Sequence, residues 1–591
     1  MRSPGPGATA FAAAAQPQQT GGGGTQKLSS FERDTLFLQA LAILSPHRIP
    51  APYRSAGAGR VAPPKCATML LAEIRRQVHE FTDEQQAVLA SLFSRPQNLP
   101  LTHVSQSGWY RIHYTLQGLD GVSELDGNGD GVPDYVEQVA AAFDSSHTLE
   151  VERLNYRQPP DDLGVDGGEY DVYISALARG VYGFTTLENA IPSTPQNDVT
   201  SFIQIDNDFN NDHFTTGVPG ARVTAAHELF HAIQFGYRDA IVSSEYFYYE
   251  VCSSWMEDVV YDDINDYYAS VPGYLSRTDT PFNKYEPPTS FNYGAALWNH
   301  FLVEKYGDAG LVLRSWQLMQ NEAAVLSAID GSLRDVGSSF EAEFGEFALW
   351  NYFTGERADS VRYYSEGHNY TRVRLVVDQP VFVDTTVVDS TRTLSYKYYR
   401  FTTLDSATYL LTGQVEEPEM WRFAVIVQRP GGEDELQLIR VEQGLNLGSL
   451  PESTRIVVVP VSLKTLDGRD LTRFDDTFST FRFRLMRVGV LAAEQGIADI
   501  YPNPFILNQH NHIRFEFKPV STINLEVRIL NANGRVVKRA RLSDNTSTLT
   551  PVAFDWDGLD EQNQPVASGV YLVQLKQDHF IQFKKFAVIR K

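Results

Sequence analysis

Cysteine is scarce in this sequence, which contains only Cys66 and Cys252. So few thiols exclude a disulfide-stapled scaffold and a cysteine-rich metal cluster. The sequence also lacks any run of 18 or more apolar residues, so no segment is expected to cross a membrane as a helix. Basic residues are outnumbered, with 50 Lys and Arg against 73 Asp and Glu, which gives a net charge of −23. A chain this acidic lacks the basic face that a nucleic-acid partner requires.

Length and hydrophobic patterning predict several domains. The 591 residues correspond to about four domains of average size. Residues 1–27 are dominated by Ala, Gly, Pro and Gln, which predicts disorder. Residues 28–100 have helical spacing and predict either a propeptide-like segment or a cap on the next domain. Residues 101–365 mix strand-like and helical stretches, as expected of an α+β domain.

Two β-rich units are predicted to follow. Residues 370–490 alternate with a period of two between turn signals, which is typical of a β-sandwich. Residues 496–591 carry 12 basic against 9 acidic residues, whereas the rest of the chain is strongly acidic. This change of sign supports a domain boundary near residue 496.

A calcium-binding loop is predicted at residues 126–137, which read DGNGDGVPDYVE. The segment has the twelve-residue ligand spacing, with Gly at position 6 and Glu at position 12, that wraps six to eight oxygens around one ion. No helix is expected before it, so we expect a structural ion rather than an EF-hand sensor; the alternative is an acidic turn. The expected ligands are Asp126, Asn128, Asp130, the carbonyl of Val132, Asp134 and Glu137.

The segment His227–His231, with the sequence HELFH, is the strongest candidate for chemistry. Residues i and i+4 of a helix share one face, so both imidazoles can reach one ion. Zinc favours imidazole nitrogen and leaves a position for water in catalytic sites. Glu228 lies beside the first ligand and can accept a proton from that water. The alternative is an amphipathic helix with two structural histidines.

Two downstream glutamates are candidates for a third ligand. Glu250 follows His231 after 18 residues, and Glu257 follows seven residues later on the same helix face, about 10 Å further along. A HExxH helix followed at this spacing by a glutamate on a second helix resembles the gluzincin metallopeptidases. The resemblance implies zinc bound by His227, His231 and Glu250, and amide hydrolysis with Glu228 as the general base.

Supporting residues are less clearly defined. Some gluzincins place an aspartate four residues after the ligand glutamate to support a histidine, and Ser254 occupies that position here. Asp258 is a possible substitute. Tyr293 and His300, on a helix predicted over 292–306, are candidate transition-state stabilisers, and helix packing is their alternative role.

A predicted strand offers a place for an extended peptide. If the strand 201–205 lies at the edge of its sheet, it can pair with a substrate chain. Alternatively, its acidic end, Asp206 and Asp208, binds a second calcium.

The two cysteines allow three interpretations. Cys66 could block the open position of the metal, because a thiolate is a good zinc ligand. It could instead form a disulfide with Cys252, which lies two residues after the proposed ligand Glu250. The third possibility is two unlinked thiols.

Wider stretches of the chain carry two further resemblances. Residues 60–360 resemble secreted metalloproteases of Gram-negative bacteria, on the segments 131–136, 170–173, 227–234 and 255–258. The C-terminal unit contains, in order, YPNPF, GRVV, WDG, ASGVY and KKFAVI at 501–505, 534–537, 556–558, 567–571 and 584–589. This order resembles the type IX secretion sorting domain, an immunoglobulin-like sandwich, and implies outer-membrane export followed by release or surface attachment.

The sequence therefore predicts a multidomain protein: an α+β zincin-like metallopeptidase domain, an all-β sandwich and a C-terminal immunoglobulin-like sandwich. The expected function is a secreted zinc endopeptidase with structural calcium, acting on proteins or peptides and engaging the type IX secretion machinery. One alternative is a surface-binding protein whose metallopeptidase-like domain no longer cleaves. Another is an aminopeptidase, although no motif for gripping a free amino terminus is present.

Overall fold

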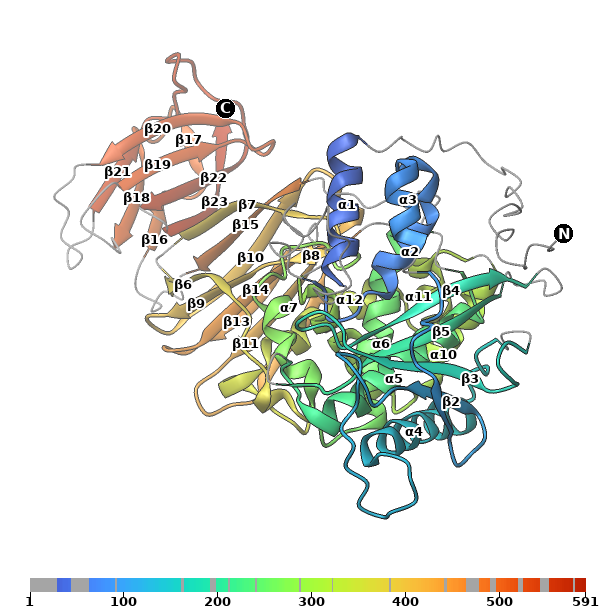
Figure 1. Cartoon of the computed structure of the whole chain (residues 1–591). Helices are drawn as coiled ribbons and strands as arrows, with labels where there is room; N and C mark the ends of the chain where they lie inside the picture. Colours follow the sequence, from blue (N-terminus) through green and yellow to red (C-terminus); the bar gives the residue numbers. More distant parts are fainter. Residues whose placement is uncertain are drawn as a thin grey trace, which may run out of the picture.

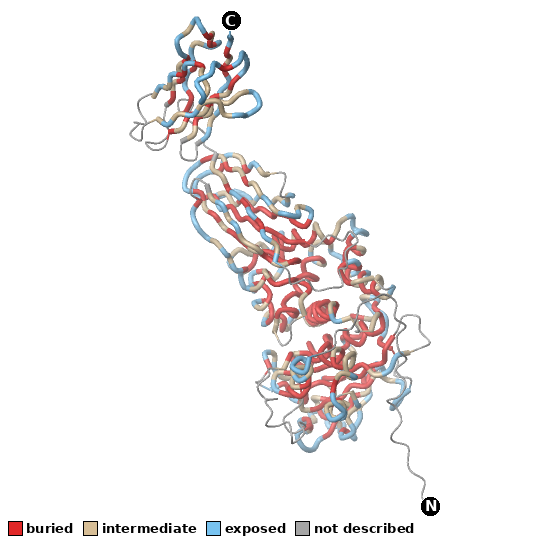
Figure 2. Tube along the Cα trace, turned by 90° about the horizontal axis from the view of Figure 1, so that it is seen from above, coloured by how far each residue is buried: buried red, intermediate tan, exposed pale blue. Residues whose placement is uncertain are grey.

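The computed structural model describes residues 29–590, except 44–62, 91–92, 161–163, 192–197, 211–212, 240–241, 286–288, 322, 382–383, 441–443, 464–477, 489–495, 519–524, 543–551 and 578–579. The predicted disorder of residues 1–27 lies outside the described residues. The described chain runs from an α/β region through a sandwich to a C-terminal β unit at one extremity of the molecule (Figure 1). Figure 2 shows that buried positions are concentrated in the middle of the molecule. Among the described residues, no helix combines the length and the apolar character needed to cross a membrane.

A five-stranded sheet of order β1-β2-β3-β5-β4 organises the first region. Strands β2, β3 and β5 are parallel, whereas β1 and β4 are antiparallel to their neighbours. The strands are β1 (Leu101–Val104), β2 (Tyr110–Tyr114), β3 (Tyr170–Ser175), β4 (Gly183–Ala190) and β5 (Val199–Asp206). The prediction that 201–205 forms a sheet edge was wrong, because β5 pairs with β3 on one side and β4 on the other. Strand β4, which precedes β5 in the chain, takes the edge position.

Two long buried helices pack beneath this sheet. Every residue of α5 (Gly217–Phe235) from Val223 onward is buried, and so is every residue of α6 (Tyr246–Val260) up to Asp258. A helix that is buried on all sides must pack between other elements, and α5 lies between the strands β4 and β5 and the helices α4 and α6. The remaining helices of this region are α4 (Asp134–His147), α7 (Val271–Leu275), α8 (Phe291–Gly294), α9 (Leu297–Tyr306), α10 (Gly310–Gln320), α11 (Val325–Arg334) and α12 (Phe340–Tyr352).

The N-terminal helices form a small layer of their own, drawn in blue in Figure 1. They are α1 (Ser30–Ala42), α2 (Thr68–Arg76) and α3 (Asp83–Ala90), and a capping box between Ser29 and Glu32 starts α1. Met69 and Ala72 of α2 belong to the main core of the α/β region, whereas most of the buried apolar side chains of the three helices share one core. Of the described residues beyond α3, only Ala178, Val181 and Phe184 join this core as fully buried members.

The sandwich consists of a sheet β13-β10-β15-β7 facing a sheet β12-β11-β14-β9-β6, with β8 paired to β14. Aromatic and aliphatic residues from both sheets fill the space between them. The outer face of the second sheet continues the core of the helical region, through residues such as Tyr396 and Val457. The strands are β6 (Leu375–Val381), β7 (Asp384–Arg392), β8 (Ser395–Tyr396), β9 (Tyr398–Thr403), β10 (Ala407–Val415), β11 (Trp421–Gln428), β12 (Asp434–Ile439), β13 (Leu445–Leu450), β14 (Arg455–Ser462) and β15 (Phe478–Val488).

The C-terminal unit is a second, smaller sandwich with a separate core that includes Trp556. A sheet β16-β18-β21 faces a sheet β17-β23-β22-β19-β20. The strands are β16 (Gly496–Tyr501), β17 (Phe505–Leu507), β18 (Ile513–Lys518), β19 (Leu525–Leu530), β20 (Val536–Leu542), β21 (Val552–Trp556), β22 (Gly569–Gln577) and β23 (Phe580–Arg590).

Candidate metal centre

Helices α5 and α6 bring three of the predicted ligands together. His227 Nε2 and His231 Nε2 lie 3.2 Å apart, as expected of residues one helical turn apart on α5. Glu250 Oε2, from α6, lies 3.4 Å from His227 Nε2 and 3.8 Å from His231 Nε2. In a tetrahedral zinc site, ligand atoms are separated by about 3.3 Å. The three atoms therefore have the spacing of a single metal site.

The opposite nitrogen of each histidine is held by a polar partner. His227 Nδ1 lies 2.7 Å from Glu257 Oε1, and His231 Nδ1 lies 2.8 Å from Gln234 Oε1. The Gln234 amide also donates to the Tyr249 carbonyl of α6 at 3.0 Å, which fixes its orientation. Because both partners accept, Nδ1 of each neutral imidazole carries the proton and Nε2 presents its lone pair. Such partners orient metal-binding histidines.

The donor set fits a cation. Both oxygens of Glu250 are buried and have no hydrogen-bond partner among the described residues. Two imidazole lone pairs and a carboxylate at this separation repel one another, and a buried unpaired carboxylate is strongly unfavourable. The residues thus match the nitrogen and oxygen chemistry that zinc prefers.

Glu257, the rival ligand, does not reach this point. Its carboxylate contacts His227 on the Nδ1 side and also accepts from Lys65 Nζ at 2.7 and 2.8 Å. Two helical turns separate it from Glu250, so it contacts His227 from the side opposite to Glu250. Ser254 Oγ is buried without a hydrogen-bond partner among the described residues. Asp258 faces His300 instead of a ligand histidine, with Oδ2 3.9 Å from Nδ1.

Glu228, the predicted general base, lies between α5 and the edge strand β4. Its Oε2 accepts from Thr185 Oγ1 of β4 at 2.8 Å and from Thr68 Oγ1 of α2 at 2.9 Å. This close approach requires Gly183 at the start of β4. A Cβ at Gly183 would lie 2.8 Å from both Gln204 O and Thr224 Cγ2, distances that packed atoms do not tolerate.

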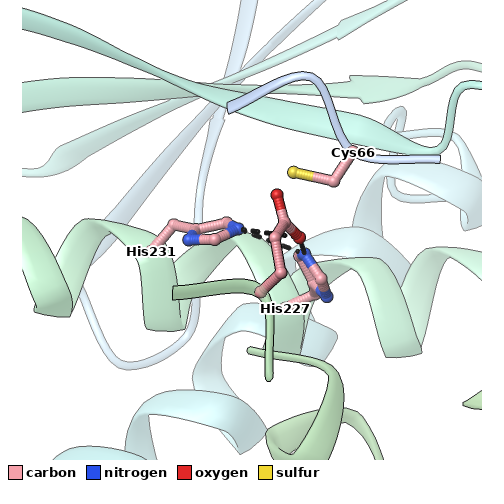
Figure 3. A group of neighbouring side chains, drawn as sticks. Cys66, His227 and His231 are labelled. Carbon is pink, nitrogen blue, oxygen red and sulfur yellow. Dashed lines mark hydrogen bonds and ion pairs between the residues drawn. The ribbon is translucent and has the colours of Figure 1, made fainter. Parts of the chain in front are cut away.

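Cys66 belongs to the same cluster. Its sulfur lies within 4.8 Å of the ligand atoms of His227, His231 and Glu250, and it points toward the two imidazoles (Figure 3). Of the three interpretations of the cysteines, the disulfide between Cys66 and Cys252 is wrong, because both cysteines are free. Cys252 is buried on another side of α6, where its sulfur accepts from Asn299 Nδ2 at 3.3 Å.

The two candidate stabilisers occupy different places. The helix predicted over 292–306 is interrupted, with Tyr293 on α8 and His300 on α9. The Tyr293 ring lies 6.2 Å from the His227 ring, and its hydroxyl is 3.2 Å from the backbone nitrogen of Cys66. His300 instead stacks on Tyr267 at 4.7 Å, and burial lowers its pKa to about 3. The structure therefore places Tyr293 at the centre and His300 elsewhere.

The predicted calcium loop forms a tight turn before α4. Asp126 accepts from the backbone nitrogens of Gly129 and Gly131 at 2.7 and 2.9 Å, and Asn128 Nδ2 contacts Glu137 Oε1 at 3.1 Å. The first and last parts of the loop thus lie close together, and Asp134 and Glu137 fall in the first turn of α4. At the predicted second calcium site, Asp206 likewise accepts from two backbone nitrogens, those of Leu177 and Phe209.

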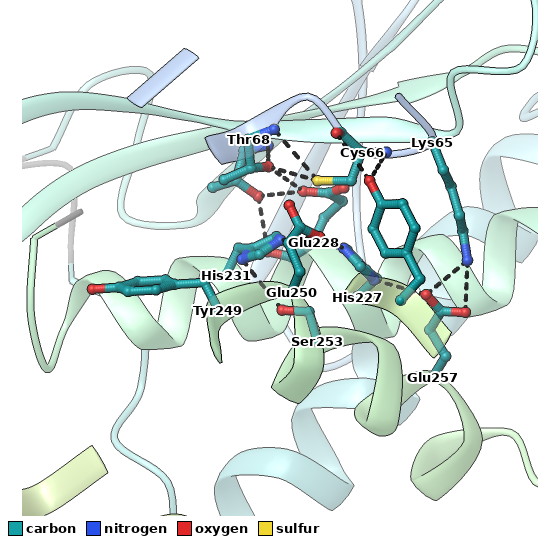
Figure 4. A network of polar contacts seen from close by, with 12 residues as sticks. Lys65, Cys66, Thr68, His227, Glu228, His231, Tyr249, Glu250, Ser253 and Glu257 are labelled. Carbon is teal, nitrogen blue, oxygen red and sulfur yellow. Dashed lines mark hydrogen bonds and ion pairs between the residues drawn. The ribbon is translucent and has the colours of Figure 1, made fainter. Parts of the chain in front are cut away.

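Sequence reasoning missed several residues of this centre. The contact of Glu257 with His227 could have been inferred, because Glu257 shares a helix face with Glu250. The contact of Thr185 with Glu228 could not, because Thr185 lies on a strand far from the motif and no spacing links the two. Lys65 and Thr68 were also missed. They come from a different part of the chain and reach the centre only through the fold (Figure 4).

The family comparison matches part of the C-terminal unit. Residues 507–579 match the family described as FlgD Ig-like domain. No curated protein matched the chain. Among solved structures, PorZ, a type-IX secretion system surface component of Porphyromonas gingivalis, is similar at 23% identity over 18% of this chain and 14% of that chain, with a TM-score of 0.14.

Two other solved structures are similar over parts of the chain. Aeromonas hydrophila PliG, a periplasmic lysozyme inhibitor, is 13% identical over 19% of this chain and 96% of its own, with a TM-score of 0.14. Faecalibacterium prausnitzii beta-glucuronidase is 11% identical over 33% of this chain and 36% of its own, with a TM-score of 0.14. The family match and the two facing sheets together identify the C-terminal unit as an immunoglobulin-like domain.

Proposed function

We propose that this protein is a zinc-dependent peptidase with a zincin-like catalytic domain. The observation that carries the proposal is the convergence of His227 Nε2, His231 Nε2 and the unpartnered Glu250 carboxylate, with Glu228 alongside. An edge strand passes directly over this centre, which is where an extended peptide could add to a sheet. The zinc ligands are proposed to be His227, His231 and Glu250, and calcium is proposed to order the 126–137 loop.

The proposed reaction is hydrolysis of a peptide bond. Zinc, when bound, supplies a Lewis acid that polarises the scissile carbonyl and activates water. Glu228 accepts one proton from the attacking water while the water oxygen bonds to the carbonyl carbon. It then delivers that proton to the leaving nitrogen as the carbon–nitrogen bond breaks. Thr185 orients the Glu228 carboxylate. The Tyr293 hydroxyl can donate to the carbonyl oxygen as negative charge develops there.

Metal content and peptide cleavage test the proposal together. We expect one zinc per native chain by mass spectrometry and less in His231→Ala. Protein from which the N-terminal helices have been removed should digest a peptide library. This digestion should be lost in Glu228→Gln, which keeps the volume of the side chain but cannot accept the proton. Equal cleavage by the native and Glu228→Gln proteins would reject the assignment. Zinc binding without any cleavage would favour the surface-binding alternative, and cleavage restricted to peptides with free amino termini would indicate an aminopeptidase.

We further propose that the immunoglobulin-like domain directs export through a type IX secretion system, which would place the protein outside the cell or on its surface. The ordered motifs between residues 501 and 589 support this role. Fusing residues 496–591 to a periplasmic reporter in a bacterium that has the system tests it. The reporter should appear in the medium or on the surface, and a reporter retained in the periplasm would contradict the proposal.

A further inference from the structure

Residues 65–68, which we call the blocking segment, lie along the outer side of the edge strand β4. Cys66 forms a parallel bridge with Gly183, and the Lys65 carbonyl accepts from the Tyr182 nitrogen at 2.9 Å. The Ala67 nitrogen donates to the Gly183 carbonyl at 3.4 Å. An edge strand offers these unpaired backbone groups to any extended chain. The blocking segment therefore uses the backbone groups that a peptide substrate would need.

The side chains of the blocking segment engage the centre itself (Figure 4). The Cys66 sulfur is within 4.8 Å of all three proposed ligand atoms. The Thr68 hydroxyl donates to Glu228 Oε2 at 2.9 Å and accepts from the Thr185 nitrogen at 2.8 Å. The base is therefore occupied by a hydroxyl that comes from outside the catalytic helices.

Two further contacts fix the blocking segment in register. Lys65 Nζ lies between Glu257 and Asp266, and its ammonium group is within 2.8 Å of Glu257. This ties the blocking segment to the same carboxylate that holds His227. On the other side, the Tyr293 hydroxyl contacts both the nitrogen and the carbonyl of Cys66 at 3.2 and 3.4 Å.

We propose that the blocking segment is an intramolecular inhibitor in which the Cys66 thiolate is the fourth protein ligand of the metal. This inference rests on the proposed zinc peptidase function and concerns the regulation of the same site. On coordination the thiol loses its proton to solvent, and the sulfur fills the position that water needs. Because Glu228 is hydrogen-bonded to Thr68 and the edge of β4 is covered, neither the attacking water nor a peptide substrate can bind at the centre.

The surrounding packing is suited to release of the blocking segment. Helix α2 continues directly from the blocking segment, and α1–α3 share a core to which the rest of the described chain contributes mainly Ala178, Val181 and Phe184. Of the described residues of this layer, only Met69 and Ala72 belong to the main core of the α/β region, so most of that core would stay in place. Removal of residues 29–90 would free the metal position, the base, Tyr293 and the edge strand together.

Cobalt substitution of the full-length protein gives a readout that does not depend on activity. A thiolate bound to cobalt(II) produces a charge-transfer absorption in the near ultraviolet. We expect this band in the native chain and in Cys252→Ser, a control that alters the other buried thiol. We expect it to be absent in Cys66→Ala and in the volume-matched Cys66→Ser, although both variants bind one equivalent of cobalt. Stoichiometric cobalt without the band in the native chain would overturn the proposal.

Peptide cleavage then separates the inhibitor from the enzyme. Zinc-loaded Cys66→Ala should cleave peptides at least tenfold faster than the native chain, and Lys65→Met/Cys66→Ala faster still. A native chain as active as these variants would reject the inhibitory role while leaving the peptidase function intact. A cobalt band without cleavage by any variant would leave Cys66 as a ligand and reject the peptidase. Failure of the native chain to bind cobalt would reject the metal centre itself.

Discussion

Glu257 Oε1 lies 2.7 Å from His227 Nδ1, so a carboxylate of α6 orients a histidine of α5. The same carboxylate also accepts from Lys65 Nζ, at 2.7 and 2.8 Å. One residue thus connects the proposed metal ligand to the blocking segment.

Glu257→Gln should weaken zinc binding. The amide keeps the shape of the side chain but loses the charge that supports His227, and losses of about 10- to 100-fold in metal affinity are typical for such partners. Competition with a chelator of known affinity measures the change. Glu341→Gln is the matched control, because Glu341 pairs with Arg422 at 2.7 Å between α12 and β11. An unchanged zinc affinity in Glu257→Gln would contradict the role given to this carboxylate.

Gly183→Ala should destabilise the α/β region. The new Cβ would meet Gln204 O and Thr224 Cγ2 at 2.8 Å, so β4 and α5 must separate. Overpacking of this kind costs about 1–3 kcal/mol, which urea denaturation can resolve. Gly168→Ala is the control, since nothing lies within 4 Å of its added Cβ. Equal unfolding midpoints for the two variants would show that this contact is not tight.

Asp258 should make the protein less stable as the pH rises. Burial, and then the charges of Glu366, Asp262, Glu257 and Glu304, raise the pKa of Asp258 from 3.8 to about 8. The folded protein therefore holds a proton that the unfolded chain releases, and this contribution to stability is complete below pH 4 and lost as the pH approaches 8.

Asp258→Asn removes this dependence. At pH 8.5 we expect the variant to be more stable than the native protein by on the order of 1–2 kcal/mol, with little difference at pH 4. Urea unfolding at both pH values measures the effect, and the exposed Asp263→Asn provides the control. A variant that is less stable at pH 8.5 would mean that the charged form of Asp258 has a stabilising partner.

Calcium should raise the melting temperature through the 126–137 loop. At 100 times the dissociation constant, a ligand specific to the folded state adds about 2.7 kcal/mol. Asp126→Asn keeps an acceptor oxygen for only one of the Gly129 and Gly131 nitrogens and removes a charged ligand, so the calcium-dependent shift should shrink or disappear. Thermal scans with calcium and with chelator measure it, beside the exposed Glu124→Gln outside the loop. A full shift in Asp126→Asn would place the ion elsewhere.

Local spacing in the sequence determined how candidate site residues on the same helix are placed relative to one another. The positions of His227 and His231 one turn apart follow from the period of the α-helix, and that period also separates Glu250 from Glu257 by two turns. Alternation in the last third of the chain predicted strands, and the FlgD Ig-like match agrees with an immunoglobulin-like end. These features depend on neighbours in the chain, so the sequence displays them directly.

Only the tertiary structure decided which distant segments meet. The strand order places β4, and not β5, at the edge of the sheet above α5. The alternation of apolar residues along a strand does not specify which strands pair with it. The break between α8 and α9 brought Tyr293 to the centre and left His300 at Tyr267. Packing across long separations placed Cys66 beside the histidines and apart from Cys252. Such contacts arise from burial of whole faces, which no local spacing encodes.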